Sequence, residues 1–278
     1  MEKAIDCDTY FDPQRAGGGY ESPSSQAVGP GPISQPAGQQ TGLMRLGIVV
    51  AMPAEARSLT KRRLALGEQI QLQENISLHL SGVGPKRARR AAEALLEKGC
   101  TALLSWGIAG GLAPGLSPGS LVLPKWVIAA DEHTYDVDPR WHDLMVSRLS
   151  GQLDLHTEAL AESPGVLASP TEKKVLFRRT SAVAVDMESA AVARVAQAGN
   201  ISFMAVRAIS DPVDSPIPKS ALVAFSSSGR LSVLRLLKGL VEHPTDLFDL
   251  VRLGLNTHAA HATLMVVARS LSGTLLIR

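Results

Sequence analysis

Cysteine is scarce in this chain, and its scarcity argues against two kinds of stabilising site. Only Cys7 and Cys100 occur among the 278 residues, far apart and in unlike surroundings. Neither a disulfide framework nor a zinc site is indicated, and this usage is typical of the reducing cytoplasm. The 7 histidines show no zinc spacing such as His-Glu-x-x-His. We expect no metal and no cofactor.

Long hydrophobic runs and charge of one sign are missing as well. No uninterrupted apolar run reaches about 18 residues, the length of a membrane-spanning helix. The first residues lack a basic region followed by an apolar core, so we expect a cytoplasmic protein that is neither secreted nor membrane-spanning. The 28 Lys and Arg residues nearly balance the 26 Asp and Glu residues, without a long basic block. This balance argues against nucleic acid as a partner.

Composition divides the chain into three stretches. Residues 1–43 are rich in Gly, Pro, Ser and Gln, and they hold too few apolar residues to offset the entropy cost of ordering, so we predict a disordered leader. Residues 44–218 are predicted to form the catalytic domain. Residues 219–278 are predicted to be a helical extension, divided at Pro244, that completes the domain or contacts a membrane or a partner.

The middle stretch predicts an α/β fold. Short Val, Ile, Leu and Ala runs alternate with helical patterns, as a largely buried sheet with helices on its faces requires. The predicted strands are 46–51, 76–81, 102–106, 120–129, 182–186 and 202–208. The predicted helices are 54–63, 85–98 and 187–198.

Three acidic residues each follow a strand-like apolar run. Glu55 comes after Leu-Gly-Ile-Val-Val-Ala-Met, Glu188 lies in Val-Asp-Met-Glu-Ser, and Asp211 closes Arg-Ala-Ile-Ser-Asp. In an open α/β sheet, ligands bind outside the carboxyl ends of the strands, where carboxylates from distant segments converge. One such acid is as often a helix cap or a solvated charge, whereas three together favour acid-base chemistry.

Two glycine-bearing turns are predicted at the same edge. Ser81-Gly82-Val83-Gly84 follows the second strand, and Trp106 to Gly111 follows the third. Such turns let the backbone approach a sugar or a nucleotide, although many are ordinary strand-to-helix connections. Neither turn matches Gly-x-Gly-x-x-Gly or ends in Gly-Lys-Ser/Thr, which argues against dinucleotide and triphosphate binding.

Five segments together resemble the successive motifs of the purine nucleoside phosphorylase and nucleosidase superfamily. They are Ile48–Glu55, Ser81–Gly84, Gly107–Pro114, Asp186–Ala190 and Arg207–Asp211. The resemblance spans about residues 45–218 and is strongest to methylthioadenosine and adenosylhomocysteine nucleosidases. It implies a central mixed, twisted sheet with helices on both faces, plus the helical C-terminal extension.

The resemblance also implies roles for the site residues. Asp211 is expected to protonate the leaving adenine as general acid, and Glu55 to activate water as general base. Glu188 matches the carboxylate that binds the ribose hydroxyls, and Met187 packs on the sugar. Gly110 is expected to border the substrate. Arg207 and Ser81 are assigned near the water and the sugar, or are an ion-pair partner and a turn hydroxyl.

Phosphate as the nucleophile is the main alternative to water. Relatives that use phosphate carry an Arg and a Ser at places that here hold Ser105 and Ile108. A phosphate dianion about 4 Å from an ionised Glu55 would be repelled by about 8 kcal/mol at an effective dielectric constant of about 20. Hydrolysis is therefore favoured, although Arg57, Arg62 and Arg63 can supply positive charge.

The C-terminal stretch is similar to the hopanoid-associated branch of the family, which implies adenosylhopane as substrate. The leading prediction is release of adenine from this lipid-linked nucleoside. The alternatives are a methylthioadenosine or adenosylhomocysteine nucleosidase, a phosphorylase, and an inactive membrane-associated binding or scaffold protein. The Leu-rich segment 230–241 favours peripheral contact with the inner membrane face or packing within the protein. We also expect a homodimer.

Overall fold

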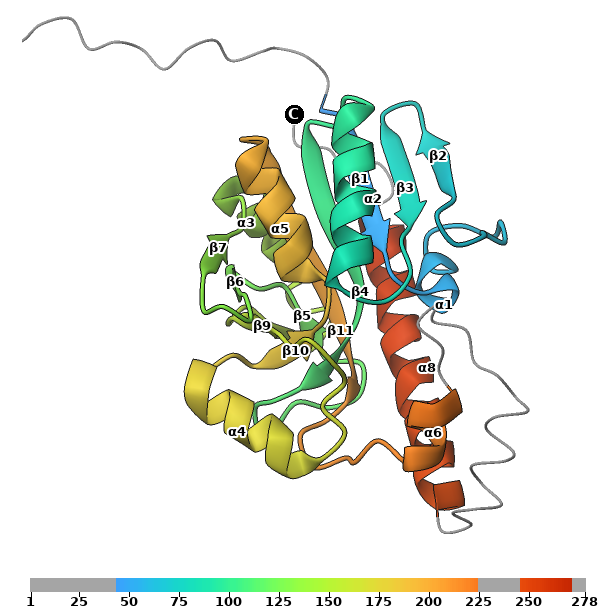
Figure 1. The fold of residues 1–278 in the computed structure, drawn as a ribbon, viewed down its shortest axis with the longest axis vertical. Helices are drawn as coiled ribbons and strands as arrows, with labels where there is room; N and C mark the ends of the chain where they lie inside the picture. Colours follow the sequence, from blue (N-terminus) through green and yellow to red (C-terminus); the bar gives the residue numbers. More distant parts are fainter. Residues whose placement is uncertain (1–43, 225–245, 272–278) are drawn as a thin grey trace, which may run out of the picture. The chain divides into compact units, whose positions relative to one another are not determined.

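The computed structural model describes residues 44–224 and 246–271, all of them within one compact unit, Gly42–Arg278. The predicted leader over 1–43, the Leu-rich segment 230–241 and Pro244 lie outside the described residues. Within them the chain forms the predicted α/β fold, a mixed sheet flanked by helices (Figure 1).

The sheet has 11 strands in the described part of the chain, most of them in the order β2-β3-β1-β4-β10-β9-β6-β7. Strand β11 pairs with β4 and β5, and β8 pairs with β5, off this path. The strands are β1 (Leu46–Val50), β2 (Gln69–Gln73), β3 (Ile76–Leu80), β4 (Ala102–Gly111), β5 (Leu121–Val122), β6 (Trp126–Ile128), β7 (Thr134–Asp136), β8 (Leu155–His156), β9 (Leu160–Glu162), β10 (Ala184–Asp186) and β11 (Ser202–Asp211).

Strand β4 is the centre of the sheet, and its two edges are paired differently. Along one edge β11 runs parallel to it from Ala102 to Gly110. Along the other edge β1 pairs only as far as Trp106, and β10 pairs antiparallel from Gly110 onward. The sheet therefore opens between the end of β1 and β10, and this opening positions the candidate site.

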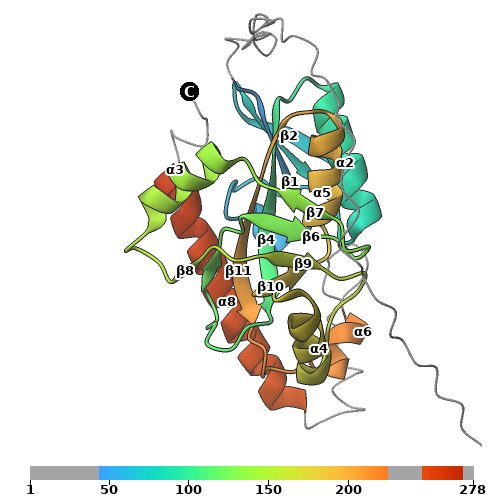
Figure 2. The same ribbon diagram turned by 90° about the vertical axis from the view of Figure 1, so that its left-hand side faces the viewer.

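Helices cover both faces of the sheet (Figure 2). They are α1 (Pro53–Ala56), α2 (Pro85–Glu97), α3 (Pro139–Leu149), α4 (Pro170–Thr180), α5 (Ser189–Ala198), α6 (Lys219–Ala224) and α8 (Asp246–Leu271). Helices α2 and α5 lie on one face, and α3 and α8 lie on the other. Helix α2 approaches β1 closely because Gly47 has no side chain: a Cβ there would lie 3.0 Å from the Leu95 Cβ.

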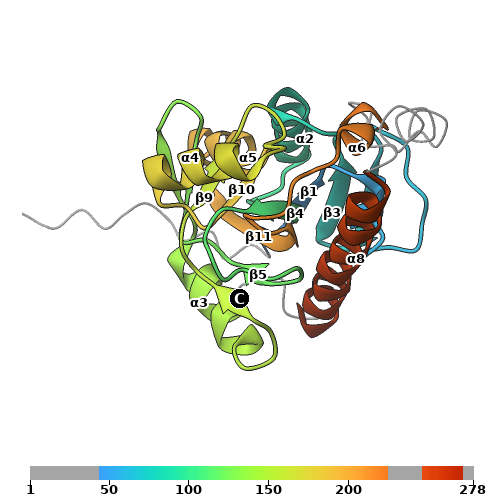
Figure 3. The ribbon, with the colours of Figure 1, turned by 90° about the horizontal axis from the view of Figure 1, so that it is seen from below.

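Helix α8 packs along β11 and continues to the opening of the sheet. Its buried Ala260, Leu264 and Val267 join the main hydrophobic core, at the three- and four-residue spacing of one helix face. Thr263 Oγ1 donates to the carbonyl of Gly119 at 2.7 Å. At the other end Ser220 of α6 donates to Asp246 of α8, and the two helices lie side by side (Figure 3).

Several predicted boundaries are wrong, each for a local reason. The single strand over 120–129 is two short strands, because Pro124 has no N–H for a ladder. The helix over 54–63 ends at Ala56, where Ser58 bonds the carbonyl of Glu55 through both its hydroxyl and its N–H. The predicted turn from Trp106 to Gly111 is strand, since β11 continues to pair with it.

Further elements lie where no strand or helix was predicted. They are the strands β2, β7, β8 and β9 and the helices α3 and α4. Helix α3 begins at an N-cap, with Asp138 Oδ1 accepting from the Trp141 N–H at 3.0 Å. The segment between Asp131 and Asp143 contains β7 and the start of α3.

Candidate active site

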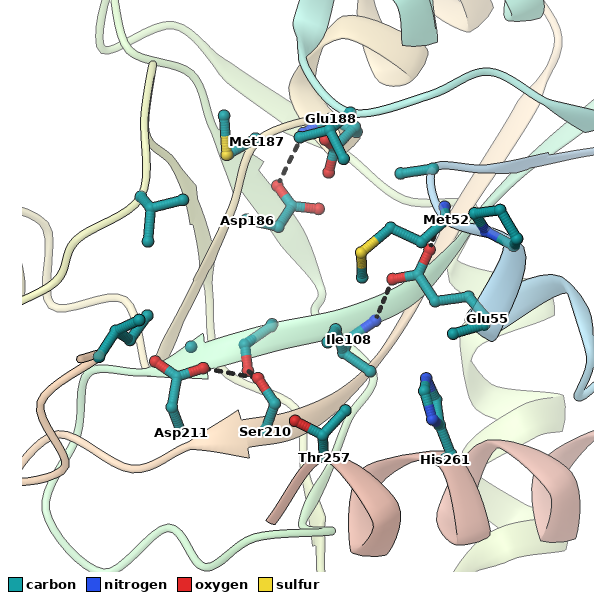
Figure 4. Close-up of a pocket in the computed structure, with 18 of the residues that line it drawn as sticks. Met52, Glu55, Ile108, Asp186, Met187, Glu188, Ser210, Asp211, Thr257 and His261 are labelled. Carbon is teal, nitrogen blue, oxygen red and sulfur yellow. Dashed lines mark hydrogen bonds between the residues drawn. The ribbon is translucent and has the colours of Figure 1, made fainter. Parts of the chain in front are cut away.

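A cavity of about 890 Å³ lies at the opening of the sheet, bordered by the carboxyl ends of several strands (Figure 4). Residues directly after β1, at the ends of β10 and β11, and near the carboxyl end of β4 all contribute to it. Of the catalytic and substrate-binding residues predicted from the sequence, five line the cavity: Glu55, Gly110, Met187, Glu188 and Asp211. Arg57, Arg62 and Arg63, the predicted source of positive charge for a phosphate, line it as well. The fold thus brings together the three carboxyl groups that are far apart in sequence.

Glu55 contacts β4 between Trp106 and Gly110, where the edge of β4 that faces β1 and β10 has no strand partner. Pro53 starts α1 directly after Met52, and the Met52 N–H donates to Glu55 Oε2 at 2.8 Å. The Ile108 N–H, which lies between the β1 and β10 pairings, donates to Glu55 Oε1 at 2.9 Å. Burial raises the pKa of Glu55, while the nearby Arg207 charge and these two N–H groups oppose the rise. The carboxyl group is held at both oxygens.

Gly107 makes this approach possible. A Cβ at this position would lie 2.8 Å from Arg207 Nη1 and would overlap the Glu55 carboxyl group. The glycine is therefore required by two side chains that meet over β4, and not by a turn.

Arg207 and Ser81 lie at the site without lining the cavity. Arg207 is 2% exposed, and its guanidinium group bonds Asp186 Oδ2 at 2.7 Å through Nε and at 2.6 Å through Nη2. Nη2 also donates to the hydroxyls of Ser105 and Ser189. The Ser81 hydroxyl donates to backbone carbonyls of its own turn and of β1. Both residues form the support beneath the cavity.

Glu188 follows β10 and precedes α5, with Met187 beside it. Its Oε1 accepts from the Gly84 N–H at 2.8 Å, which brings the predicted turn after β3 to the site. Burial raises the pKa of Glu188 to about 8, and the nearby negative charge of Asp186 adds to the rise. The carboxyl group is neutral below that pH in the free protein.

Asp211 ends β11 and is contacted by two side chains. Ser210 Oγ lies 2.5 Å from Asp211 Oδ1, and Lys173 Nζ lies 2.6 Å from Asp211 Oδ2. Burial raises the pKa of Asp211, while Lys173 and Ser210 oppose the rise.

The sequence analysis missed Lys173 and two stretches of the cavity wall. Gly165, Val166 and Leu167, which precede α4, line the cavity. Lys173 shares the buried face of α4 with Leu176, at a spacing of three. A lysine on an apolar helix face needs an anionic partner. This pattern in the sequence would have pointed to Lys173 as a neighbour of a buried acid.

Helix α8 supplies the other missed stretch. Leu253, Thr257 and His261 recur every four residues on one helix face and line the cavity, where Figure 4 shows His261 below Glu55 and Thr257 near Ser210. His261 Nε2 is buried, and no hydrogen-bond partner occurs for it among the described residues. The described ranges contain no group of three or more His, Cys, Asp or Glu able to hold a metal. No helix in those ranges is long and apolar enough to cross a membrane.

Comparison with known proteins gives one family and a set of similar folds. The model of the phosphorylase superfamily matches residues 45–242. Futalosine hydrolase of Helicobacter pylori is 18% identical, with 83% of this chain and 98% of that chain covered and a TM-score of 0.61. A methylthioadenosine/adenosylhomocysteine nucleosidase from S. pneumoniae, solved with a transition-state inhibitor, is 18% identical over 82% and 100%, with a TM-score of 0.58. A Helicobacter pylori nucleosidase mutant, with 5′-methylthioadenosine in its active site, is 19% identical over 82% and 99%, with a TM-score of 0.57.

Proposed function

The chain belongs to the phosphorylase superfamily, and from that premise we propose that it hydrolyses the N-glycosidic bond of an adenine nucleoside. The observation that carries the proposal is the convergence of three buried carboxyl groups, those of Glu55, Glu188 and Asp211, on one cavity. Cleavage passes through an oxocarbenium-like state, in which the leaving base gains a proton while a nucleophile reaches the anomeric carbon. One carboxyl group must therefore give a proton and another must take one.

The positions of the groups support one division of roles. Asp211 is the general acid for the base, because burial keeps its carboxyl group protonated to a higher pH than usual. Glu55 is the general base for water at the opposite wall (Figure 4). Glu188 binds the ribose hydroxyls and Met187 packs on the sugar. Gly110 leaves room beside the general acid, since a Cβ there would lie 3.1 Å from Asp211 Oδ2.

Water is the nucleophile in this proposal. The Ile108 N–H, a donor that a bound phosphate would use, is already bonded to Glu55. The Ser105 hydroxyl is likewise bonded to Arg207 and Ser189 beneath the cavity. The Glu55 charge also disfavours a second anion beside it. Arg207 and Ser81 act indirectly, by holding Asp186 and the turn before Gly84.

For the substrate we propose adenosylhopane, a nucleoside whose 5′ substituent is a large hydrocarbon. Pockets for small ligands span about 300–1,000 Å³, and the cavity of about 890 Å³ lies near the upper end. Its wall includes the apolar side chains of Leu64, Val83, Val166, Leu167, Ile217, Leu222 and Leu253. Burying hydrocarbon against them contributes about 25 cal/mol per Å² of apolar area.

The test is turnover of a substrate panel by the purified protein. Adenine release is measured from methylthioadenosine, adenosylhomocysteine and an adenosylhopane-bearing lipid extract, with and without phosphate. We expect adenosylhopane to have the highest kcat/KM and ribosyl-hopane to form without phosphate. Preference for methylthioadenosine would favour the small-substrate alternative, and ribosyl phosphate as product would identify a phosphorylase.

A pair of variants on α8 sharpens the test. Leu253→Glu places a charge inside the cavity, and Leu255→Glu places one on the exposed face of the same helix. Leu253→Glu is expected to lower adenosylhopane turnover far more than methylthioadenosine turnover. Leu255→Glu should leave turnover of methylthioadenosine unchanged. Equal effects of Leu253→Glu on both substrates would contradict the proposed place of the hydrocarbon.

We also propose peripheral contact with a membrane through the first half of α8. Four apolar side chains there are exposed, and they adjoin Leu253 at the cavity: Leu247, Phe248, Val251 and Leu255. Co-sedimentation with lipid vesicles is the measurement, and Phe248→Glu with Leu255→Glu should abolish it. Unchanged sedimentation of that double variant would refute the contact. The homodimer and the cytoplasmic location stay predictions, and light scattering tests the first.

A further inference from the structure

Lys173 is a fully buried lysine at the wall of the cavity. It lies in the first turn of α4, which starts at a capping box formed by Ser169 and Glu172. Its Nζ, which carries three N–H donors, lies within hydrogen-bonding distance of three backbone carbonyl oxygens, those of Asp211, Pro212 and Ser215, at 3.0, 3.0 and 3.2 Å. The fourth acceptor is Asp211 Oδ2 at 2.6 Å. Lysine is almost never fully buried without a charged partner, and here that partner is the proposed general acid.

The two oxygens of Asp211 have different neighbours. Oδ2 faces the Lys173 ammonium group, which can only donate. Oδ1 faces the Ser210 hydroxyl, which also lies 3.3 Å from the carbonyl of Ala109. A hydroxyl both donates and accepts. Ser210 can therefore donate to an ionised Oδ1, or donate to Ala109 and accept from a protonated Oδ1.

We propose that Lys173 is a positioning residue for Asp211, holding Oδ2 on its ammonium group so that Oδ1 is the atom that carries and delivers the proton. This inference rests on the proposed nucleosidase function. A proton on Oδ2 would point at the N–H groups of Lys173, which cannot accept it. A proton on Oδ1 can be accepted by the Ser210 hydroxyl until a bound adenine takes the place of that acceptor.

The proton transfer then balances in charge. The O–H bond at Oδ1 breaks, its electron pair stays on Asp211, and an N–H bond forms on the five-membered ring of adenine. The electron pair of the glycosidic bond goes to the leaving base. The new Asp211 carboxylate lies beside the Lys173 ammonium group, which balances its charge in a buried site. The attacking water forms a new C–O bond to the anomeric carbon and gives one proton to the ionised Glu55.

Lys173 also limits how strongly Asp211 retains its proton. Burial raises the pKa of Asp211, and the Lys173 charge is the largest effect in the opposite direction. A general acid works best when its pKa lies near the working pH. Without the ammonium group, Asp211 would hold its proton to a higher pH and release it less readily.

The experiment compares Lys173→Met and Lys173→Gln with the control Lys174→Met. Lys174 is the next residue, and it pairs with Asp214 at 2.7 Å on the exposed side of α4. The first readout is the titration of the Asp211 carboxyl carbon by NMR with ¹³C-labelled aspartate, assigned by its loss in Asp211→Asn. We expect both Lys173 variants to titrate at higher pH than the wild type, and Lys174→Met to match the wild type.

The second readout is turnover against pH. Both Lys173 variants should lose about 10- to 100-fold in kcat with little change in KM, a part of the 10²- to 10⁴-fold that a positioned acid supplies. The part of the kcat–pH curve in which activity falls as Asp211 loses its proton should move to higher pH in both variants. If Lys173→Met does not fold, both measurements are made on Lys173→Gln, whose amide still donates to the backbone carbonyls.

The two readouts separate failure of the inference from failure of the proposed function. An unchanged Asp211 titration in a folded Lys173 variant would overturn the positioning role, whatever the activity. A shifted titration in a protein that cleaves no nucleoside would instead reject the nucleosidase proposal while leaving the Lys173–Asp211 coupling in place. A kcat unchanged in the variants, with an active wild type, also counts against the inference.

Discussion

The backbone N–H of Gly84 donates to Glu188 Oε1 at 2.8 Å across 104 positions of sequence. Gly84 has a φ of +105°, a conformation that side-chain-bearing residues rarely adopt, and it is the N-cap of α2. A turn that only glycine adopts readily thus presents its N–H to the buried carboxyl group of Glu188. The contact joins the turn after β3 to the start of α5 at the cavity wall.

The raised pKa of Glu188 predicts how stability depends on pH. The folded protein keeps a proton on Glu188 up to about pH 8, whereas the ordinary pKa of a glutamate, which applies to the unfolded chain, is 4.5. Between these pH values the unfolded state binds fewer protons, so the free energy of unfolding falls as pH rises. We expect Glu188→Gln, which stays neutral, to raise the Tm over the wild type at pH 8 and to change it little at pH 4.5.

Glu97→Gln is the matched control, because Glu97 is exposed at the end of α2. Its Tm difference from the wild type should be small and similar at both pH values. Thermal unfolding followed by circular dichroism provides the measurement. A Tm gain for Glu188→Gln that is no larger at pH 8 than at pH 4.5 would show that Glu188 is ionised in the folded protein.

Asp211→Asn is expected to lose both turnover and stability. The amide cannot deliver a proton, so adenine release should fall about 10²- to 10⁴-fold. At pH values where Asp211 is ionised, the change also leaves the Lys173 charge buried without an anionic partner, and breaking a buried ion pair costs about 3–5 kcal/mol. The double variant Asp211→Asn with Lys173→Met should regain much of the lost stability without regaining turnover. Denaturant unfolding and adenine release measure the two effects, and additive stability losses would contradict the pairing.

Glu55→Gln is expected to stop hydrolysis while keeping the binding of a nucleoside analogue. An amide retains an acceptor for the Ile108 N–H but cannot take a proton from water. Adenine release should therefore drop by at least about 100-fold, with an analogue Kd close to that of the wild type by calorimetry. If phosphate restores cleavage in this variant and the wild type forms ribosyl phosphate, the nucleophile is phosphate.

Gly107→Ala is expected to lower turnover and stability together. Its Cβ would overlap the Glu55 carboxyl group and come within 2.8 Å of Arg207 Nη1, and both side chains are too well packed to move freely. Gly254→Ala is the control, because nothing lies within 4 Å of the added methyl group on α8. That change should leave turnover intact and stabilise the helix by about 0.5–1 kcal/mol. Wild-type activity in Gly107→Ala would show that Glu55 needs no close approach to β4.

The local pattern of the sequence predicted the long central strands and the two helices on one face of the sheet. β1, β3, β4, β11, α2 and α5 all overlap their predicted ranges, because apolar runs and helical spacing are strongest where both faces or one whole face are buried. The short strands β7, β8 and β9 have too few residues to show a period, and β5 and β6 were predicted as a single strand. Their pairing depends on partners far along the chain.

The acidic residues at the strand ends, and the motif order that resembles the phosphorylase superfamily, were likewise visible in the sequence alone. Only the tertiary structure decided what surrounds each carboxyl group. Lys173 meets Asp211 across 38 positions and Ile108 meets Glu55 across 53, and no local pattern contains such contacts. Desolvation and charge act through space, so the same three acids acquire different neighbours and shifted pKa values only once the sheet, α4 and α8 close around one cavity.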